Sequence, residues 1–89
     1  HDAAAPASLT EVLGVSATPA WLRDLERDAR QRLEVGQSDV WDVLTRQFEA
    51  CLIHSALELT RGRRIEAAQK LGIGRNTITR KIQELGMDE

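Results

Sequence analysis

The chain has 89 residues, a length typical of one small domain with a modest core. It contains one cysteine, Cys51, which excludes a disulfide framework and a cysteine-based metal site and fits a reducing, intracellular compartment. No apolar run approaches the roughly 18 residues that span a bilayer, and no secretory signal is present, so we expect no membrane partner. Because the sequence does not begin with Met, we expect it to be a segment of a longer protein.

The net charge of −2 is unevenly distributed along the chain. Residues 60–82 contain seven basic residues and one acid, whereas all other residues together contain five basic residues and 13 acids. A positive segment within an acidic chain indicates a polyanionic partner for that segment. From charge alone, these residues could equally form a helix face that is simply exposed to solvent.

The first 17 residues are rich in alanine and show no sustained periodicity, so we interpret residues 1–17 as a linker that is flexible. Ser8 and Glu11 match a capping box, the pattern that begins a helix, and leave open one helical turn within this linker. The composition favours the linker without a helix.

The first long helix is predicted to begin at Thr18-Pro19 and to cover residues 19–34. Thr18 can cap it, and proline fits the first helical position because its missing N–H would have no partner there. Gly36 closes the helix. Its apolar face has spacings of three and four and consists of Leu22, Leu25, Ala29 and Leu33.

A second, longer helix is predicted over residues 39–60, capped by Ser38 or Asp39 and ended by the Arg61-Gly62 step. Its apolar stripe is wider than one neighbouring helix would cover. We therefore expect two copies of the chain to associate, so that the two helix pairs form a four-helix bundle. The predicted dimer interface consists of Leu44, Phe48, Cys51, Leu52 and Leu59.

Two short helices, residues 64–71 and 75–85, are predicted on either side of Gly72-Ile73-Gly74. A pair of helices joined by a short turn with glycine fits the helix-turn-helix plan. Ala67 and Ala68 are small enough to let the second helix pack closely across the first.

The second short helix separates into two faces at about 100° per residue. Ile78, Ile82 and Leu85 define its buried face, and donors fill the outward positions. Side chains near the start of such a helix contact base edges, and other basic or hydroxyl side chains hold phosphates. The predicted base-reading residues are Arg75, Asn76 and Thr79, and the predicted phosphate contacts are Arg61, Arg63, Arg64, Thr77, Arg80 and Lys81.

The segment GRRIEAAQKLGIGRNTITRKIQELGMDE, residues 62–89, resembles the C-terminal DNA-binding domain of the nitrogen regulatory protein C (NtrC) family, which is of the Fis helix-turn-helix type. The resemblance is looser over residues 38–61 and weak before residue 37. Gly74 and Thr79 stand where Fis has Asn and Arg, and the Gly-Arg-Asn-Thr sequence follows the NtrC branch. The resemblance places DNA-contacting positions at Arg75, Asn76, Thr77, Thr79, Arg80 and Lys81.

The resemblance implies an all-α fold of four helices, with dimerisation helices in residues 18–60 and a helix-turn-helix in residues 63–86 of a Fis-type domain, 18–89. It also implies a homodimer that binds palindromic enhancer sites in double-stranded DNA. The protein would be a sigma-54-dependent activator of nitrogen regulation in a two-component system, cytoplasmic and nucleoid-associated. Contacts with sigma-54 RNA polymerase would be made by domains outside this chain.

Two alternatives remain open: Fis-like architectural bending of DNA, and a helical oligomerisation module that binds an acidic protein. No Ser/His/Asp, Cys/His or paired-carboxylate arrangement stands out in the sequence. We therefore expect no enzymatic activity, no cofactor and no metal.

Overall fold

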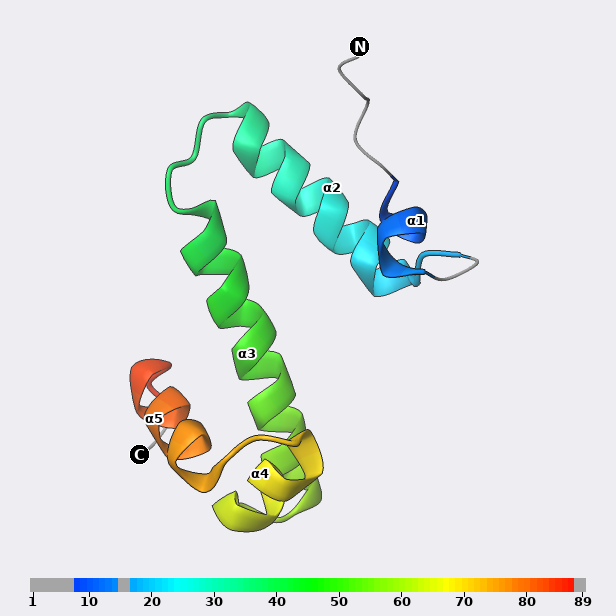
Figure 1. Ribbon diagram of the computed structural model, residues 1–89. Coiled ribbons are helices and arrows are strands. Elements are labelled where there is room, and N and C mark those ends of the chain that lie inside the picture. The colour runs from blue at the N-terminus through cyan, green and yellow to red at the C-terminus, as the bar shows by residue number, and fades with distance from the viewer. Residues whose placement is uncertain (1–7, 15–16, 88–89) are drawn as a thin grey trace. The chain divides into compact units, whose positions relative to one another are not determined.

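A computed structural model describes residues 8–14 and 17–87 of the chain (Figure 1). The described residues form helices and no strand, so the predicted all-α class is confirmed. No helix in these ranges is long and apolar enough to cross a bilayer. Contacts divide the chain into two units, His1–Ser38 and Asp39–Glu89. The helices are α1 (Leu9–Leu13), α2 (Ala20–Glu34), α3 (Val40–Leu59), α4 (Arg64–Leu71) and α5 (Arg75–Glu84).

The short helix α1 is the main difference from the predicted elements, since composition favoured a linker without a helix there. Its capping box is formed: the Glu11 N–H donates to the Ser8 hydroxyl at 3.3 Å, and the Ser8 N–H donates to the Glu11 carboxylate at 3.1 Å. These two bonds satisfy N–H groups that the first turn would otherwise leave free. The rest of the predicted linker falls partly on residues 1–7 and 15–16, which lie outside the described residues.

Helix α2 has the predicted extent, but Thr18 does not cap it. Pro19 occupies the capping position, and no side chain bonds to the first turn. Thr18 precedes the capping position, and its hydroxyl forms a hydrogen bond of 2.7 Å with the Thr10 hydroxyl instead. The helix ends before Gly36, whose φ of 82° belongs to the left-handed region.

Helix α3 ends in a sharp corner that leads into α4. The buried Thr60 hydroxyl lies 2.9 Å from the carbonyl oxygen of Ala56 and 3.1 Å from that of Arg63, so it can bond to either side of the corner. Arg61 and Gly62 then take positive φ values of 58° and 83°. The predicted end of the helix at the Arg61-Gly62 step is confirmed.

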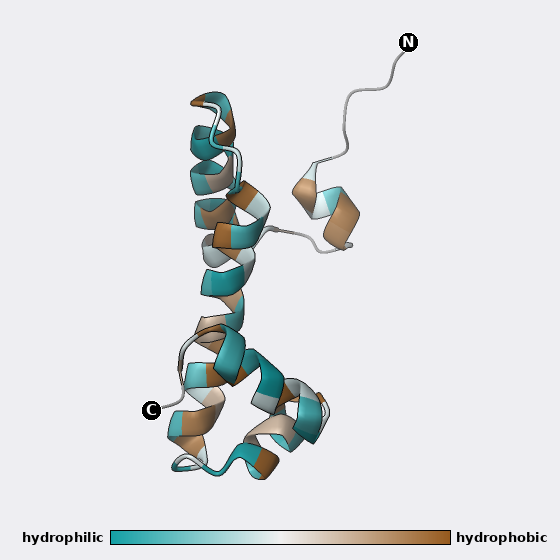
Figure 2. Ribbon diagram, turned by 90° about the vertical axis from the view of Figure 1, so that its left-hand side faces the viewer, coloured by the Kyte–Doolittle hydropathy of each residue, from teal (hydrophilic) through white to brown (hydrophobic). Residues whose placement is uncertain are grey.

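The core of the Asp39–Glu89 unit lies where α4 and α5 pack against the C-terminal half of α3 (Figure 1). Figure 2 shows that the helices carry both hydrophobic and hydrophilic residues, as an amphipathic pattern requires. The small side chains of α4 allow close approach, as the sequence predicted. The buried apolar residues of this core are Ile53 and Ala56 of α3, Ala67 and Ala68 of α4, and Ile78 and Ile82 of α5.

The turn between α4 and α5 also has the predicted form. Gly72 ends α4 with a φ of 82°, which favours glycine, and the Ile73 N–H donates to the Ala68 carbonyl at 3.0 Å. Gly74 is the capping residue of α5. The chain thus turns within three residues, and the two helices form a helix-turn-helix.

Candidate nucleic-acid interface

Helix α5 presents two different faces, as its sequence predicted. Ile78 and Ile82 are fully buried against α3 and α4. Arg75, Asn76 and Arg80 are exposed. The outward face therefore offers guanidinium and amide groups, which can hydrogen-bond base edges and phosphates.

The start of α5 adds to this positive surface. Its first turn contains Arg75 and Asn76 and no acidic residue, and Gly74 supplies no side-chain cap. The unpaired N–H groups and the positive end of the helix dipole therefore lie beside the two exposed side chains. This end of α5 is suited to an anionic partner.

Thr79, the third predicted base-reading residue, is less available than the other two. It is half-buried, and its hydroxyl donates to the Arg75 carbonyl at 3.0 Å. Its proton is used within the helix, so the side chain can offer a partner its oxygen as an acceptor and its methyl group.

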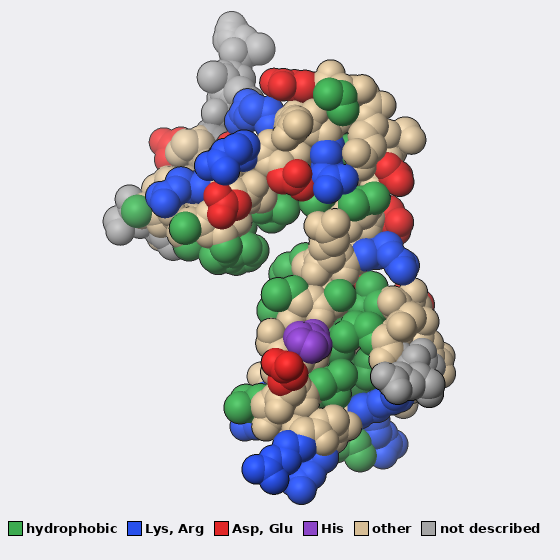
Figure 3. All heavy atoms as spheres, turned by 180° about the vertical axis from the view of Figure 1, so that it is seen from behind, with side chains coloured by type: hydrophobic (Ala, Val, Ile, Leu, Met, Phe, Trp, Pro, Cys, Tyr) green, Lys and Arg blue, Asp and Glu red, His purple; other side chains and the backbone are tan. Residues whose placement is uncertain are grey.

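Three arginines lie at the corner between α3 and α4. Arg61, Arg63 and Arg64 are all exposed, and Arg63 pairs with Glu66 at 3.2 Å. In Figure 3, Lys and Arg side chains gather at the end of the unit that carries the helix-turn-helix. The predicted phosphate-contacting arginines therefore project into solvent from the corner.

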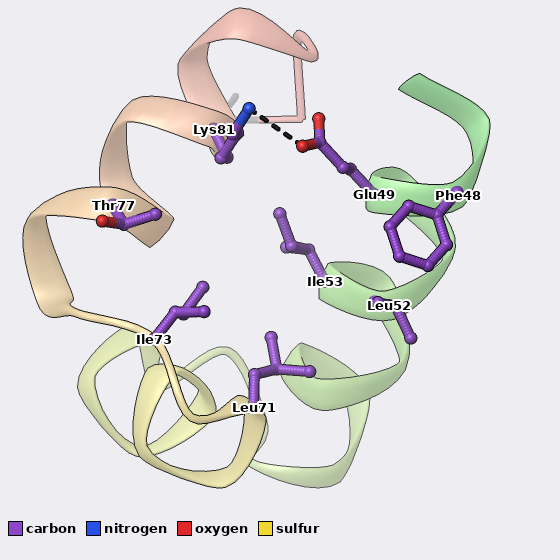
Figure 4. A pocket seen from close by; sticks show the side chains of 8 residues that line it. All are labelled: Phe48, Glu49, Leu52, Ile53, Leu71, Ile73, Thr77 and Lys81. Carbon is purple, nitrogen blue, oxygen red and sulfur yellow. Dashed lines mark ion pairs between the residues drawn. The ribbon is translucent and has the colours of Figure 1, made fainter. Parts of the chain in front are cut away.

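Thr77 and Lys81, in contrast, face α3. They line a pocket of about 260 Å³ between α3 and the helix-turn-helix (Figure 4). The Lys81 Nζ atom lies 2.9 Å from the Glu49 Oε2 atom of α3. These two predicted phosphate contacts therefore lie on the flank of α5 that faces α3, whereas Arg80 is exposed on its outer face. The pocket is lined by Phe48, Glu49, Leu52, Ile53, Leu71, Ile73, Thr77 and Lys81.

Glu49 is not among the site residues predicted from the sequence. The residue stands among other charged and apolar residues of a long helix, and its partner belongs to another helix far along the chain. No periodicity or motif marks such a pair, because it depends on how α5 packs against α3.

The five predicted dimer-interface residues lie on one face of α3. At about 100° per residue they fall within an arc of about 100°, and the core residues Ala56 and Ile53 lie about 40° and 100° beyond its edge. Phe48, Leu52 and Leu59 are 47%, 44% and 71% exposed. Cys51 is exposed and Leu44 is half-buried. Among the described residues of the Asp39–Glu89 unit, this apolar face is therefore only partly covered.

Residues 45–85 match the family described as "Bacterial regulatory protein, Fis family". The matched residues contain α4, the turn and α5 together with most of α3. This part of the chain is a helix-turn-helix domain of the Fis family, a non-enzymatic domain of bacterial regulators.

The chain is also similar to individual regulators. It is 41% identical over 69 residues to the "DNA-binding transcriptional regulator NtrC" of Proteus hauseri, an alignment that covers 78% of this chain and 15% of that protein. It is 37% identical over 87 residues to NtrC of Klebsiella pneumoniae, with 98% of this chain and 18% of that protein covered. The chain spans less than a fifth of the length of these two relatives.

A third relative connects the chain with Fis itself. "DNA-binding protein Fis" of Proteus mirabilis (strain HI4320) is 31% identical over 51 residues, which cover 57% of this chain and 52% of that protein. No solved structure matches the chain at a significant level. The two similarities to NtrC given above are higher in identity and extend over more of the chain than the similarity to Fis.

Proposed function

We propose that the chain is a sequence-specific DNA-binding and dimerisation domain of a bacterial transcriptional activator. One observation carries the proposal: the second helix of a Fis-family helix-turn-helix exposes Arg75, Asn76 and Arg80 on its outer face. Arginine can bind guanine through two hydrogen bonds, and asparagine can do the same with adenine. The partner is double-stranded DNA, with α5 lying in the major groove.

The contacts divide into two kinds. Arg75, Asn76 and Thr79 read bases, because they lie in the first turns of α5, which enter the groove most deeply. Phosphates are held by exposed basic side chains of α5 and of the corner before α4. We assign this second role to Arg61, Arg63, Arg64 and Arg80, and Thr77 remains a predicted phosphate contact.

The dimer is supported by the partly exposed apolar face of α3. Phe48 and Leu59 expose large apolar side chains to water on this face, as Trp21 does on α2. Exposed apolar patches of this kind mark interaction surfaces. A second copy would cover them, and its two-fold symmetry predicts a palindromic DNA site with half-sites about 10 base pairs apart.

The similarity to NtrC suggests the cellular setting. We propose that the domain holds a sigma-54-dependent activator of nitrogen regulation, part of a two-component system, at palindromic enhancer sites in the bacterial nucleoid. Contacts with sigma-54 RNA polymerase would be made by domains outside this chain. The support is the identity of 37–41% with proteins whose name is "DNA-binding transcriptional regulator NtrC".

A DNA titration tests the proposal. The purified chain is titrated with a palindromic enhancer duplex and with a random duplex at several salt concentrations. We expect affinity for both to fall with salt, with a log–log slope of about −0.9 for each neutralised phosphate. We also expect tighter binding to the specific duplex by a factor on the order of 10³ or more. A flat salt response on both duplexes would contradict the proposal.

The same titration separates the proposed role from Fis-like architectural bending, which the similarity to Fis of Proteus mirabilis favours. An architectural protein holds DNA through its backbone and its deformability, with relaxed base specificity. Nearly equal affinities for the two duplexes would support that second function.

A further inference from the structure

We propose that Lys81 is a positioning residue that orients helix α5 through its ion pair with Glu49, and that it is not a phosphate contact. This inference rests on the proposed function, because the orientation of α5 matters for base reading only if α5 enters a DNA groove. It reassigns one predicted DNA contact and gives Glu49 of α3 a role in recognition.

The environment of the pair differs from that of the other basic residues of α5. The Lys81 and Glu49 side chains are only 27% and 23% exposed, and their charged atoms lie 2.9 Å apart. Arg80, the neighbouring basic residue, is 59% exposed and lies 3.7 Å from its partner, Glu84. Among the residues that the structure describes, every other ion pair joins side chains three or four positions apart, whereas this pair joins two separate helices.

Figure 4 shows how the pair is placed. Lys81 extends from α5 toward Glu49 across the pocket, above the apolar side chains of Ile53 and Leu71. The pocket leaves open space between α3 and this flank of α5. Side-chain packing therefore does not fill the region that the ion pair bridges.

The position of Lys81 around the helix decides what the pair can do. Ile78 and Ile82 hold α5 against the core along one line. A helix held along one line can still roll about its own axis. Lys81 lies about 80° around the helix from that line, so its tether to α3 opposes the roll.

Roll of α5 would act directly on base reading. A recognition site requires its side chains to stay within roughly 0.5 Å and 10–20° of the productive geometry. Arg75 and Asn76 lie at the end of α5 and follow its rotation. Because α3 also carries the proposed dimer face, the tether would fix both recognition helices relative to the two-fold axis.

Glu49→Gln tests the proposal by the direction of its effect on DNA affinity. The change removes a negative charge beside Lys81 and leaves it only the longer pair with Glu84 at 3.8 Å, so electrostatics alone predict tighter binding to a polyanion. Loss of a tether predicts the opposite, a specific affinity about three- to tenfold weaker. As the matched control, Glu66→Gln removes the exposed acid that pairs with Arg63 and should leave affinity unchanged or raise it. Equal or tighter binding by the Glu49→Gln protein would overturn the proposal.

The salt dependence supplies a second readout, which a phosphate contact and a tether affect differently. Arg80→Gln and Lys81→Gln each remove one positive charge from α5. We expect Arg80→Gln to reduce the magnitude of the log–log salt slope by about 0.9, and Lys81→Gln to weaken specific binding with the slope nearly unchanged. If Lys81→Gln also reduces the slope by about 0.9, Lys81 is a phosphate contact.

Thermal unfolding in the absence of DNA tests the Glu49–Lys81 tether separately from the proposed DNA-binding function. Thermal unfolding is measured at one protein concentration for the wild type, Glu49→Gln, Lys81→Gln and the double variant. A coupled pair predicts that the double variant loses less in Tm than the two single losses together. Coupling without any DNA affinity in the wild type would overturn the proposed function and leave the pair a structural one. Additive losses with normal wild-type DNA binding would overturn the tether alone.

Discussion

At the scale of single residues, the side chains of α5 and of the preceding corner divide by exposure and by partner. Arg75 and Asn76 are exposed at the start of α5, whereas Lys81 is held by Glu49 at the pocket. Thr79 uses its proton inside the helix. Arg75 and Asn76 are therefore more available to DNA than Thr79 and Lys81. Their spacing in the sequence does not reveal this difference.

Arg75→Ala should identify a base-reading side chain. If the guanidinium binds a base edge, the variant loses about 1–3 kcal/mol of affinity on the specific duplex and much less on random DNA. Competition binding with both duplexes measures the difference. Lys70→Ala, which removes an exposed charge from α4, is the control and should change both affinities only slightly. Equal losses on the two duplexes for Arg75→Ala would reassign Arg75 to the phosphate backbone.

Arg61 has a conformation that supports a dedicated role for its side chain. It is the non-glycine residue with positive φ in the described ranges, at 58°, a conformation that costs about 1–2 kcal/mol for side chains with a Cβ atom. Arg61→Gly relieves this strain in the folded state but gives the unfolded chain more conformational entropy. The net effect should be a free energy of unfolding that is higher by up to about 1 kcal/mol. The same variant should bind DNA more weakly, with a salt slope about 0.9 smaller in magnitude.

Chemical denaturation and DNA titration check both halves of this Arg61 prediction. Arg61→Ala is the control, because it removes the charge and keeps the strained backbone. It should lose the same DNA affinity without any gain in stability. A glycine variant that binds DNA as tightly as the wild type would show that the Arg61 side chain makes no phosphate contact.

At the scale of elements, α3 belongs both to the core and to the proposed dimer interface. Its Ile53 and Ala56 belong to the core, and its Phe48 and Leu59 lie exposed on another face. One helix therefore supports the helix-turn-helix on one side and is proposed to bind a second copy of the chain on another.

Phe48→Asp tests the second face. Because Phe48 lies outside the buried core, the variant should keep its helical content in circular dichroism but sediment as a monomer at concentrations where the wild type is dimeric. It should also lose most specific DNA affinity, since a single half-site contact remains. Gln47→Asp puts the same charge on an exposed polar position next to it and should stay dimeric. A Phe48→Asp dimer with normal DNA binding would show that the interface lies elsewhere.

The elements themselves could largely be predicted from sequence, because their signals are local. Glycine at 72, 74 and 86 and the spacing of Ile78 and Ile82 define α5 and its buried face without any knowledge of the partner helices. Helix α1 was not favoured, because five residues with a capping box carry no periodicity strong enough to outweigh the composition around them. The Glu49–Lys81 pair could not be predicted, because it depends on tertiary packing.

At the scale of the whole molecule, the core of a single copy is small. Among the described residues of the Asp39–Glu89 unit, three isoleucines and three alanines are the buried apolar side chains, and large apolar residues of α3 remain exposed. A unit of this size is marginal on its own, and burial of the α3 face in a dimer would add to its stability.

Stability should therefore depend on protein concentration. If dimerisation stabilises the fold, the Tm of the wild type rises as the concentration is increased over two or three orders of magnitude. Scanning calorimetry or circular dichroism measures the shift. Phe48→Asp is the control, and its Tm should not change with protein concentration. A wild-type Tm that is independent of concentration would indicate that the single chain is stable without its partner.

Binding-site selection is the most direct test of the proposed recognition of a palindromic DNA site, because it reports DNA binding, symmetry and specificity in one measurement. The purified chain is used to enrich sequences from a pool of random duplexes. We expect the wild type to enrich an inverted repeat whose half-sites lie about 10 base pairs apart, and Arg75→Ala to lose sequence preference within the half-sites. A pool that shows no enriched sequence, or an enriched site without two-fold symmetry, would contradict the proposed recognition.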